Sequence, residues 1–163
     1  MGNYKDLEYE FVERTLLLIA QYEGMLHKFD FKEQYNYTLL INCLTGLIVM
    51  PKERTISAIP ADRLLSKMKT EMGLVNTVIN DDITNLKDLI VALRHCVAHF
   101  SIEIKSENDD NFIDDIICYD NQKRQGYVVA NFKAGELLPF VRYYANWLLS
   151  NLKIAKNTLK RHS

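Results

Sequence analysis

The segment DITNLKDLIVALRHCVAHF, residues 82–100, decides the fold, because its apolar residues recur with the period of an α-helix. Residues three, four and seven positions apart share one helical face, so this spacing predicts one amphipathic helix from about Asp82 to Phe100. The face that we expect to be buried consists of Leu86, Leu89, Ile90, Leu93, Val97 and Phe100.

Two long helices are predicted at the start of the chain. The first covers about Leu7 to Phe29, and the second covers about Phe31 to Met50, where Pro51 ends it. The second is apolar almost all round near its middle, so we expect it to lie centrally in a bundle. The residues that the first is expected to bury are Leu7, Phe11, Leu18, Tyr22, Met25 and Phe29.

Two further helices complete the helical part of the prediction. A shorter one starts after Pro60 and ends near Gly73, since proline favours the first turn of a helix and glycine its end. A long last helix carries a stripe made of Leu138, Val141, Tyr144, Leu148, Leu152 and Leu159.

Between residue 100 and the last helix the apolar period changes from helical to strand-like. Three short strands are predicted, over Ile102–Lys105, Ile113–Tyr119 and Tyr127–Phe132, with polar turns between them. The predicted fold is therefore mainly α, a bundle of four to five helices with a small antiparallel β insertion before the last helix. No linker or repeat interrupts it, so residues 1–163 are expected to form a single domain.

Composition limits the classes of function. The 163 residues carry a net charge of -1, which gives no global electrostatic case for binding nucleic acid, so any RNA contact must be local. The cysteines Cys43, Cys96 and Cys118 have no zinc-like spacing, and their odd number favours reduced thiols. No stretch is apolar and long enough to cross a bilayer, so we expect a cytoplasmic protein without a membrane partner.

The outward face of the helix over residues 82–100 combines ionisable and small side chains. On a helical wheel, Arg94 flanks the apolar stripe, whereas His95 and His99 lie on the opposite face. A solvated face would carry Lys and Glu, but this one carries Val91, Ala92 and Ala98. The pattern indicates a second contact surface, either for another helix or for a second copy of the chain.

Spacing alone leaves structural alternatives for these residues. An Arg-x4-His pattern arises by chance in many helices, and His99 near a helix C-terminus can simply stabilise the helix dipole when protonated. His95 and His99, at i and i+4, are too few ligands for a metal site, so neither a metal nor a cofactor is predicted.

Beyond spacing, the segment Leu93–Phe100 resembles the signature of the HEPN superfamily of ribonucleases. That signature is an arginine, a polar residue and then a histidine near a helix end, here Arg94, His95 and His99. Residues 11–15, 38–44 and 51–53 are similar to a plasmid- and mobile-element-associated branch of the superfamily.

The resemblance implies a metal-independent endoribonuclease in which the ribose 2′-OH attacks the adjacent phosphate and leaves a 2′,3′-cyclic phosphate. Arg94 and His99 would be catalytic, because a guanidinium binds phosphate oxygens and an imidazole moves protons near neutral pH. It also implies a homodimer with a composite site and a possible role as a toxin or antiphage effector. His95 would support the site, with secondary positions at Glu13, Arg14 and Asn42.

Other features stay open. Asn42 has a structural reading as a hydrogen-bonded core residue, and the basic end of the last helix has one in helix-dipole stabilisation. A weak RNA-binding reading of that end involves Lys153, Lys156, Lys160 and Arg161.

Partners and alternatives also follow from the resemblance. Some HEPN toxins are silenced by modification of a tyrosine two positions after the histidine. Here that position is Ser101, so an antitoxin or defence-system partner would act differently. The alternatives are a non-catalytic RNA- or nucleotide-binding module and a dimeric interaction protein.

Overall fold

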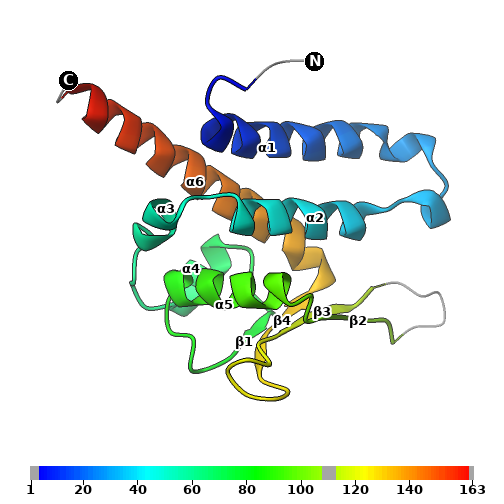
Figure 1. Cartoon of the computed structure of the whole chain (residues 1–163). Coiled ribbons are helices and arrows are strands. Elements are labelled where there is room, and N and C mark those ends of the chain that lie inside the picture. The colour runs from blue at the N-terminus through cyan, green and yellow to red at the C-terminus, as the bar shows by residue number, and fades with distance from the viewer. Residues whose placement is uncertain (1–3, 108–112, 162–163) are drawn as a thin grey trace. The chain divides into compact units, whose positions relative to one another are not determined.

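The structure is a computed structural model that describes residues 4–107 and 113–161 (Figure 1). The chain divides into two compact units. The first unit contains residues 1–51 and 141–163, and the second contains residues 52–140. The last helix, α6 (Ala134–Arg161), contributes its first turns to the second unit and the remainder to the first unit.

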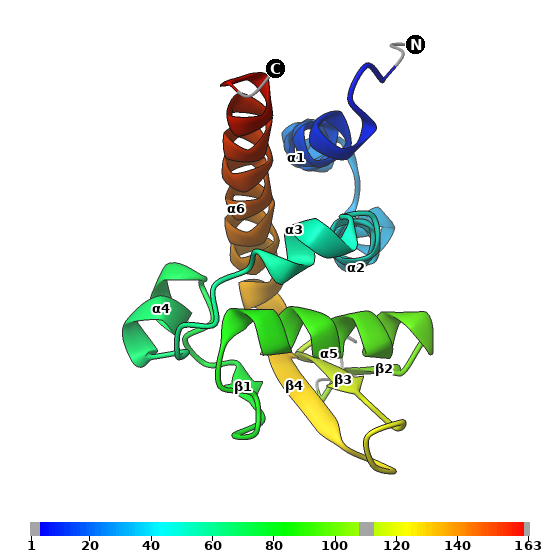
Figure 2. The same ribbon diagram turned by 60° about the vertical axis from the view of Figure 1, so that its left-hand side comes forward.

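The first unit begins with two helices that lie side by side in Figures 1 and 2. They are α1 (Leu7–Met25) and α2 (Asn36–Val49), with the 3-10 turns η1 (Leu26–Lys28) and η2 (Phe31–Glu33) between them. The ring of Phe11 packs so closely on Gly46 that a Cβ atom there would lie 2.8 Å from its Cζ atom. Both predicted helices are confirmed.

The predicted buried face of α1 is wrong. The helix buries Val12, Thr15 and Ile19, while Leu7 and Leu18 are about half exposed, at 53% and 48%. Met25 and Phe29 are exposed as well. The apolar residues of this helix are spread over more than one face, so their helical period does not by itself specify which face is covered.

The second unit consists of a four-stranded antiparallel sheet with helices. The strands are β1 (Val78–Ile79), β2 (Ile102–Lys105), β3 (Asp115–Tyr119) and β4 (Val128–Lys133), in the order β1-β4-β3-β2. Helix α5 (Leu86–Ala98) contacts β3 and β4, and Figure 2 shows it running across the sheet. Two short helices, α3 (Glu53–Ser57) and α4 (Ser66–Glu71), precede β1.

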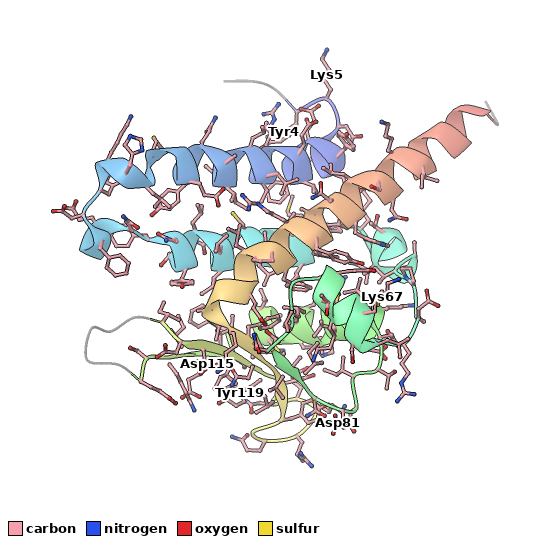
Figure 3. The ribbon with its side chains drawn as sticks, turned by 180° about the vertical axis from the view of Figure 1, so that it is seen from behind. Tyr4, Lys5, Lys67, Asp81, Asp115 and Tyr119 are labelled. Carbon is pink, nitrogen blue, oxygen red and sulfur yellow. The ribbon has the colours of Figure 1, made fainter. Side chains whose placement is uncertain are left out.

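The sheet confirms the three predicted strands but is more than the small insertion that was expected. Strand β1 precedes α5 in the chain and pairs with β4, so the sheet receives strands from both sides of α5. On β3, Asp115 and Tyr119 mark the two ends of the strand in Figure 3. Asp115 is nearly buried and accepts a hydrogen bond from Lys133 Nζ at 2.7 Å, which ties β3 to the end of β4.

Helix α4 ends in a Schellman motif that explains why Gly73 follows it. The N–H of Gly73 donates to the Thr70 carbonyl, and the N–H of Leu74 donates to the Lys69 carbonyl. Gly73 has a φ of 75°, in the left-handed region that glycine adopts without a steric penalty. The predicted glycine end of this helix is confirmed, but its predicted start after Pro60 is wrong, because the helix begins at Ser66.

The carboxylate of Glu136, in the first turn of α6, holds the loop before β1. It accepts hydrogen bonds from the backbone N–H and the side chain of both Asn76 and Thr77, at 2.7–3.0 Å. Burial by itself would raise the pKa of Glu136, but these hydrogen bonds lower it below its ordinary value.

We therefore expect Glu136→Gln to lower the free energy of unfolding by about 2 kcal/mol at neutral pH, since hydrogen bonds to a charged group contribute about 1.5–3 kcal/mol. A carboxyl with a depressed pKa stabilises the fold above its unfolded pKa, about 4.3, and loses this effect as pH falls through its folded pKa. Urea unfolding from pH 7 to pH 3 should show a flatter acid limb for the variant.

The control for this measurement is Glu71→Gln, because Glu71 is exposed and, within the described part of the chain, pairs with Lys67 at 4.0 Å. Such a surface pair contributes about 0–1 kcal/mol. Equal losses in the two variants would contradict the role of Glu136.

Candidate functional site on helix α5

Helix α5 is fixed at its start by a reciprocal cap. The side-chain oxygen of Asn85 accepts from the backbone N–H of Asp88 at 2.8 Å, and its amide donates to the Asp88 carboxylate at 2.7 Å. The helix therefore begins four residues later than predicted, at Leu86. The buried face that packs on the sheet consists of Leu86, Leu89, Ile90, Leu93 and Cys96.

Across the interface between α5 and β3, Cys96 and Cys118 are both buried and unbridged. Hydrogen bonding to the Cys96 thiol and burial raise the pKa of Cys118 well above its ordinary value. Cys118 is therefore a protonated packing group at neutral pH. The predicted reduced state of the cysteines agrees with their free thiols.

The end of α5 presents the motif. His99 is the C-terminal cap and is exposed. Phe100 follows with a φ of 48°, and its N–H donates to Val97 while that of Ser101 donates to Cys96. This is the Schellman geometry seen after α4, but with phenylalanine in the place where α4 has glycine. Among the described residues, no other non-glycine residue has a positive φ.

The prediction that Phe100 belongs to the buried stripe is wrong. Its side chain is 85% exposed, because the helix ends at Ala98 and the left-handed backbone turns the chain away from the helical path. Cys96 is fully buried on the face that contacts the sheet.

His95 is paired with a carboxylate that the sequence did not reveal. His95 Nδ1 lies 3.2 Å from Asp120 Oδ2, and the carboxylate is 7% exposed whereas the imidazole is 50% exposed. Asp120 comes directly after β3, in the turn that leads to β4. A strand-end aspartate is a common turn residue, so no sequence signal linked it to a histidine 25 positions earlier.

His95 and Asp120 line a pocket of about 210 Å³ beside the outward face of α5. Neither Arg94 nor His99 lines it. Arg94 is partly buried, on the flank of the helix, as predicted from the wheel. The second unit thus carries all three motif residues on one helix, with a hydrogen-bonded histidine one turn before the exposed His99.

A comparison with protein families matches residues 1–154 to a family model described as HEPN pEK499 p136. The chain belongs to the HEPN pEK499 p136 family. The predicted membership of the HEPN superfamily, in its plasmid-associated branch, is confirmed. HEPN domains are often RNA-related and dimeric, so the family supports an RNA-related role in general. No curated protein and no solved structure gives a significant match.

The three secondary positions that the HEPN resemblance implied all lie in the first unit, whereas the motif lies in the second. Glu13 is exposed, and Arg14 pairs with Glu10 at 2.8 Å and stacks on the Tyr4 ring at 4.1 Å. Figure 3 labels Tyr4 near the start of α1. Asn42 is exposed on α2, so its reading as a buried core residue is wrong.

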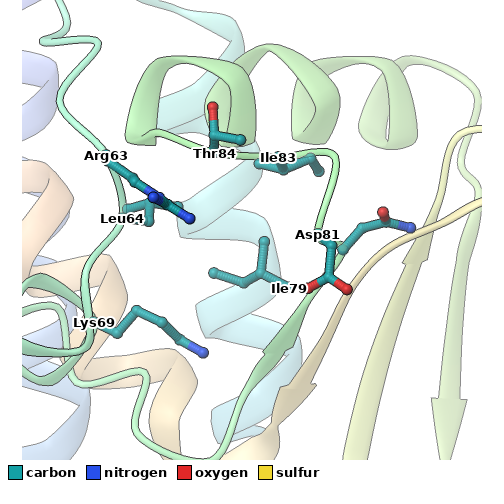
Figure 4. A pocket seen from close by; sticks show the side chains of 8 residues that line it. Arg63, Leu64, Lys69, Ile79, Asp81, Ile83 and Thr84 are labelled. Atoms are coloured by element: carbon teal, nitrogen blue, oxygen red, sulfur yellow. The ribbon is translucent and has the colours of Figure 1, made fainter.

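The basic end of α6 in this HEPN chain is described only in part. Lys153 is exposed, while the side chains of Lys156, Lys160 and Arg161 lie outside the described ones. Figure 4 shows a different pocket, of about 190 Å³, where Arg63 and Lys69 face Asp81 across Ile79. None of the motif residues lines it, and Lys69 Nζ already donates to the Thr77 carbonyl at 3.0 Å.

Neither a metal cluster nor a membrane-spanning helix is found in the described part of this HEPN chain. Within residues 4–107 and 113–161, no three His, Cys, Asp or Glu side chains gather as metal ligands would. No helix in the same ranges combines the length and the apolar character needed to cross a membrane.

Proposed function

We propose that this HEPN chain is a metal-independent endoribonuclease that acts as a homodimer in the cytoplasm. The 2′-oxygen of a ribose forms a bond to the adjacent phosphorus, and the bond from phosphorus to the 5′-oxygen breaks. One proton leaves the 2′-OH and another reaches the 5′-oxygen, which gives a 2′,3′-cyclic phosphate and a 5′-OH. His99 moves protons in this reaction, and Arg94 stabilises the charge on the phosphate.

The observation that carries the proposal is the exposure of His99 at the end of α5, in the motif of a chain that matches a HEPN family model over residues 1–154. An exposed imidazole at the end of a helix can reach a phosphodiester that approaches from solvent. Arg94, five residues earlier, offers a guanidinium that remains charged at every physiological pH.

A second copy of the chain resolves a chemical difficulty, because one histidine cannot easily remove and donate a proton in the same step. The outward face of α5 supports such a dimer, since Val91 and Ala98 are exposed on it and Ala92 is partly so. Small side chains let two helices approach closely, which brings two motifs together. We include in the proposal that residues 1–163 act as one HEPN domain, in a toxin or antiphage role.

The test is incubation of the purified protein with end-labelled RNA in EDTA, with analysis of the product ends and of the molecular mass by light scattering. We expect a dimer that leaves 2′,3′-cyclic phosphate ends. Cleavage that requires a divalent metal, or 3′-OH products, would contradict the proposal.

The alternative is a non-catalytic RNA- or nucleotide-binding module. It stays an alternative because the net charge of -1 and the carboxylates of Asp82, Asp88 and Asp120 around the pocket beside α5 do not provide a basic groove for a long RNA, whereas a nucleotide or a short RNA needs fewer phosphate contacts. Binding of RNA that survives His99→Ala, without cleavage by the wild type, would support this alternative.

A further inference from the structure

The contact between His95 and Asp120 joins a nearly buried carboxylate to a half-exposed imidazole. Asp120 Oδ2 meets His95 Nδ1 at 3.2 Å, and the imidazole reaches from there into the pocket beside α5. An exposed surface pair would leave both groups solvated. Here the Asp120 carboxylate is buried, and the His95 ring extends from it toward the solvent.

The Asp120 carboxylate is held in place from its own turn. Its other oxygen, Oδ1, accepts from the backbone N–H groups of Gln122 and Lys123, at 3.2 and 3.3 Å. The pairing of β3 with β4 is irregular between Cys118 and Tyr119, directly before Asp120. Irregularities of this kind often re-aim the side chain that follows.

The charge of Asp120 is also fixed. Burial by itself would raise the pKa of Asp120, but the hydrogen bonds from His95 and from the turn lower it below its ordinary value. Asp120 therefore only accepts at neutral pH, so the neutral imidazole must carry its proton on Nδ1. That tautomer leaves Nε2 as an unprotonated base.

The remaining charged groups of the pocket do not compete for this contact. Lys123 Nζ lies 2.9 Å from Tyr127 Oη and 3.5 Å from Asp82 Oδ2, and the Asp88 carboxylate accepts from Asn85 at the helix cap. Of the titratable groups that line the pocket, Asp120 is the one that lies within hydrogen-bond distance of His95.

We propose that Asp120 is a positioning residue that holds His95 as the proton acceptor for the attacking 2′-OH. This rests on the proposed ribonuclease function. The proton passes from the 2′-OH to His95 Nε2, the 2′-oxygen bonds to phosphorus as the bond from phosphorus to the 5′-oxygen breaks, and the departing 5′-oxygen takes a proton from His99 of the second copy in the proposed dimer. His95 lies in the last turn of α5, and His99 follows the helix as its C-terminal cap, so a dimer that joins two copies of the motif would offer one phosphodiester both histidines.

The test is Asp120→Asn, because asparagine keeps Oδ1 for the turn but presents an amide to His95. A donating amide favours the opposite tautomer, with the proton on Nε2. We expect kcat for RNA cleavage to fall about 10- to 100-fold with KM unchanged. The ¹⁵N chemical shifts of the His95 ring should report the change of tautomer, independently of cleavage.

The matched control is Asp82→Asn, which removes the same charge from the same pocket without touching His95. We expect it to leave kcat within about twofold of the wild type. A second comparison places Asp120→Asn in a His95→Gln background, where it should cause no further loss if Asp120 acts through His95.

Several results would overturn the inference. An equal loss from Asp120→Asn with and without His95 would indicate a structural role only, as would an unchanged tautomer. A wild type that cleaves RNA no faster than Asp120→Asn overturns the inference and leaves the proposed function intact. A wild type that cleaves no RNA overturns both.

Discussion

Replacing His99 with alanine should slow RNA cleavage by about two to four orders of magnitude, the usual contribution of one positioned acid or base. The fold should survive, because the His99 side chain is exposed and the cap at the end of α5 is made by the backbone N–H of His99, which alanine keeps. Loss of a favourable dipole interaction would cost about 0.3–1 kcal/mol at most. Single-turnover cleavage and thermal unfolding of the same samples check both expectations.

The matched control for this variant is His27→Ala. His27 is also exposed and lies at the end of a helical segment, in η1, but it is outside the motif. It should leave the cleavage rate unchanged. Equal rates for wild type and His99→Ala would remove the basis of the catalytic assignment, whereas a collapse of the unfolding midpoint would show that His99 is structural.

The second large effect is expected at Gly73. An alanine there would be forced into a left-handed conformation, which costs about 1–2 kcal/mol, and its Cβ would lie 2.3 Å from Pro139 Cβ. Relief of that overlap requires α6 to move and adds about 1–3 kcal/mol. Gly73→Ala should therefore lower the free energy of unfolding by about 3 kcal/mol, as measured by urea titration.

A variant at Gly126 distinguishes the cost of the left-handed backbone from the cost of the steric overlap with Pro139. It has a similar φ of 70°, but no atom lies within 4 Å of the position that an alanine Cβ would occupy there. Gly126→Ala should therefore cost only about 1–2 kcal/mol, the conformational part. If both variants lost the same amount, the contact between Gly73 and Pro139 would contribute nothing.

The sequence predicted those parts of the fold that depend on the local spacing of apolar residues and on residues such as proline and glycine that end helices. Strand Ile102–Lys105 was placed to the residue, and α5 was identified from its apolar stripe with its start within four residues and its end within two. Strand β1 was missed because its two residues, Val78 and Ile79, are too few to show the alternation of apolar and polar residues that predicts a strand. Its existence depends on the pairing with β4, which is about 50 residues away.

The candidate site was predicted to a similar extent. Arg94, His95 and His99 were found because their spacing lies within one helix. Asp120 was not, since its partner is brought to it by the packing of α5 on β3. Phe100 was misassigned because an apolar residue in helical register is expected to be buried, and nothing in the residue type indicates a left-handed backbone.

The buried thiols of Cys96 in α5 and Cys118 in β3 can report how often these two elements separate. A thiol that is covered and protonated does not react with an alkylating reagent, so Cys118 becomes modified only when α5 separates from β3. The rate of modification under native conditions then equals the frequency of that separation multiplied by the fraction of openings that are captured. Labelling of Cys118 therefore reports how often the region between the motif helix and the sheet opens.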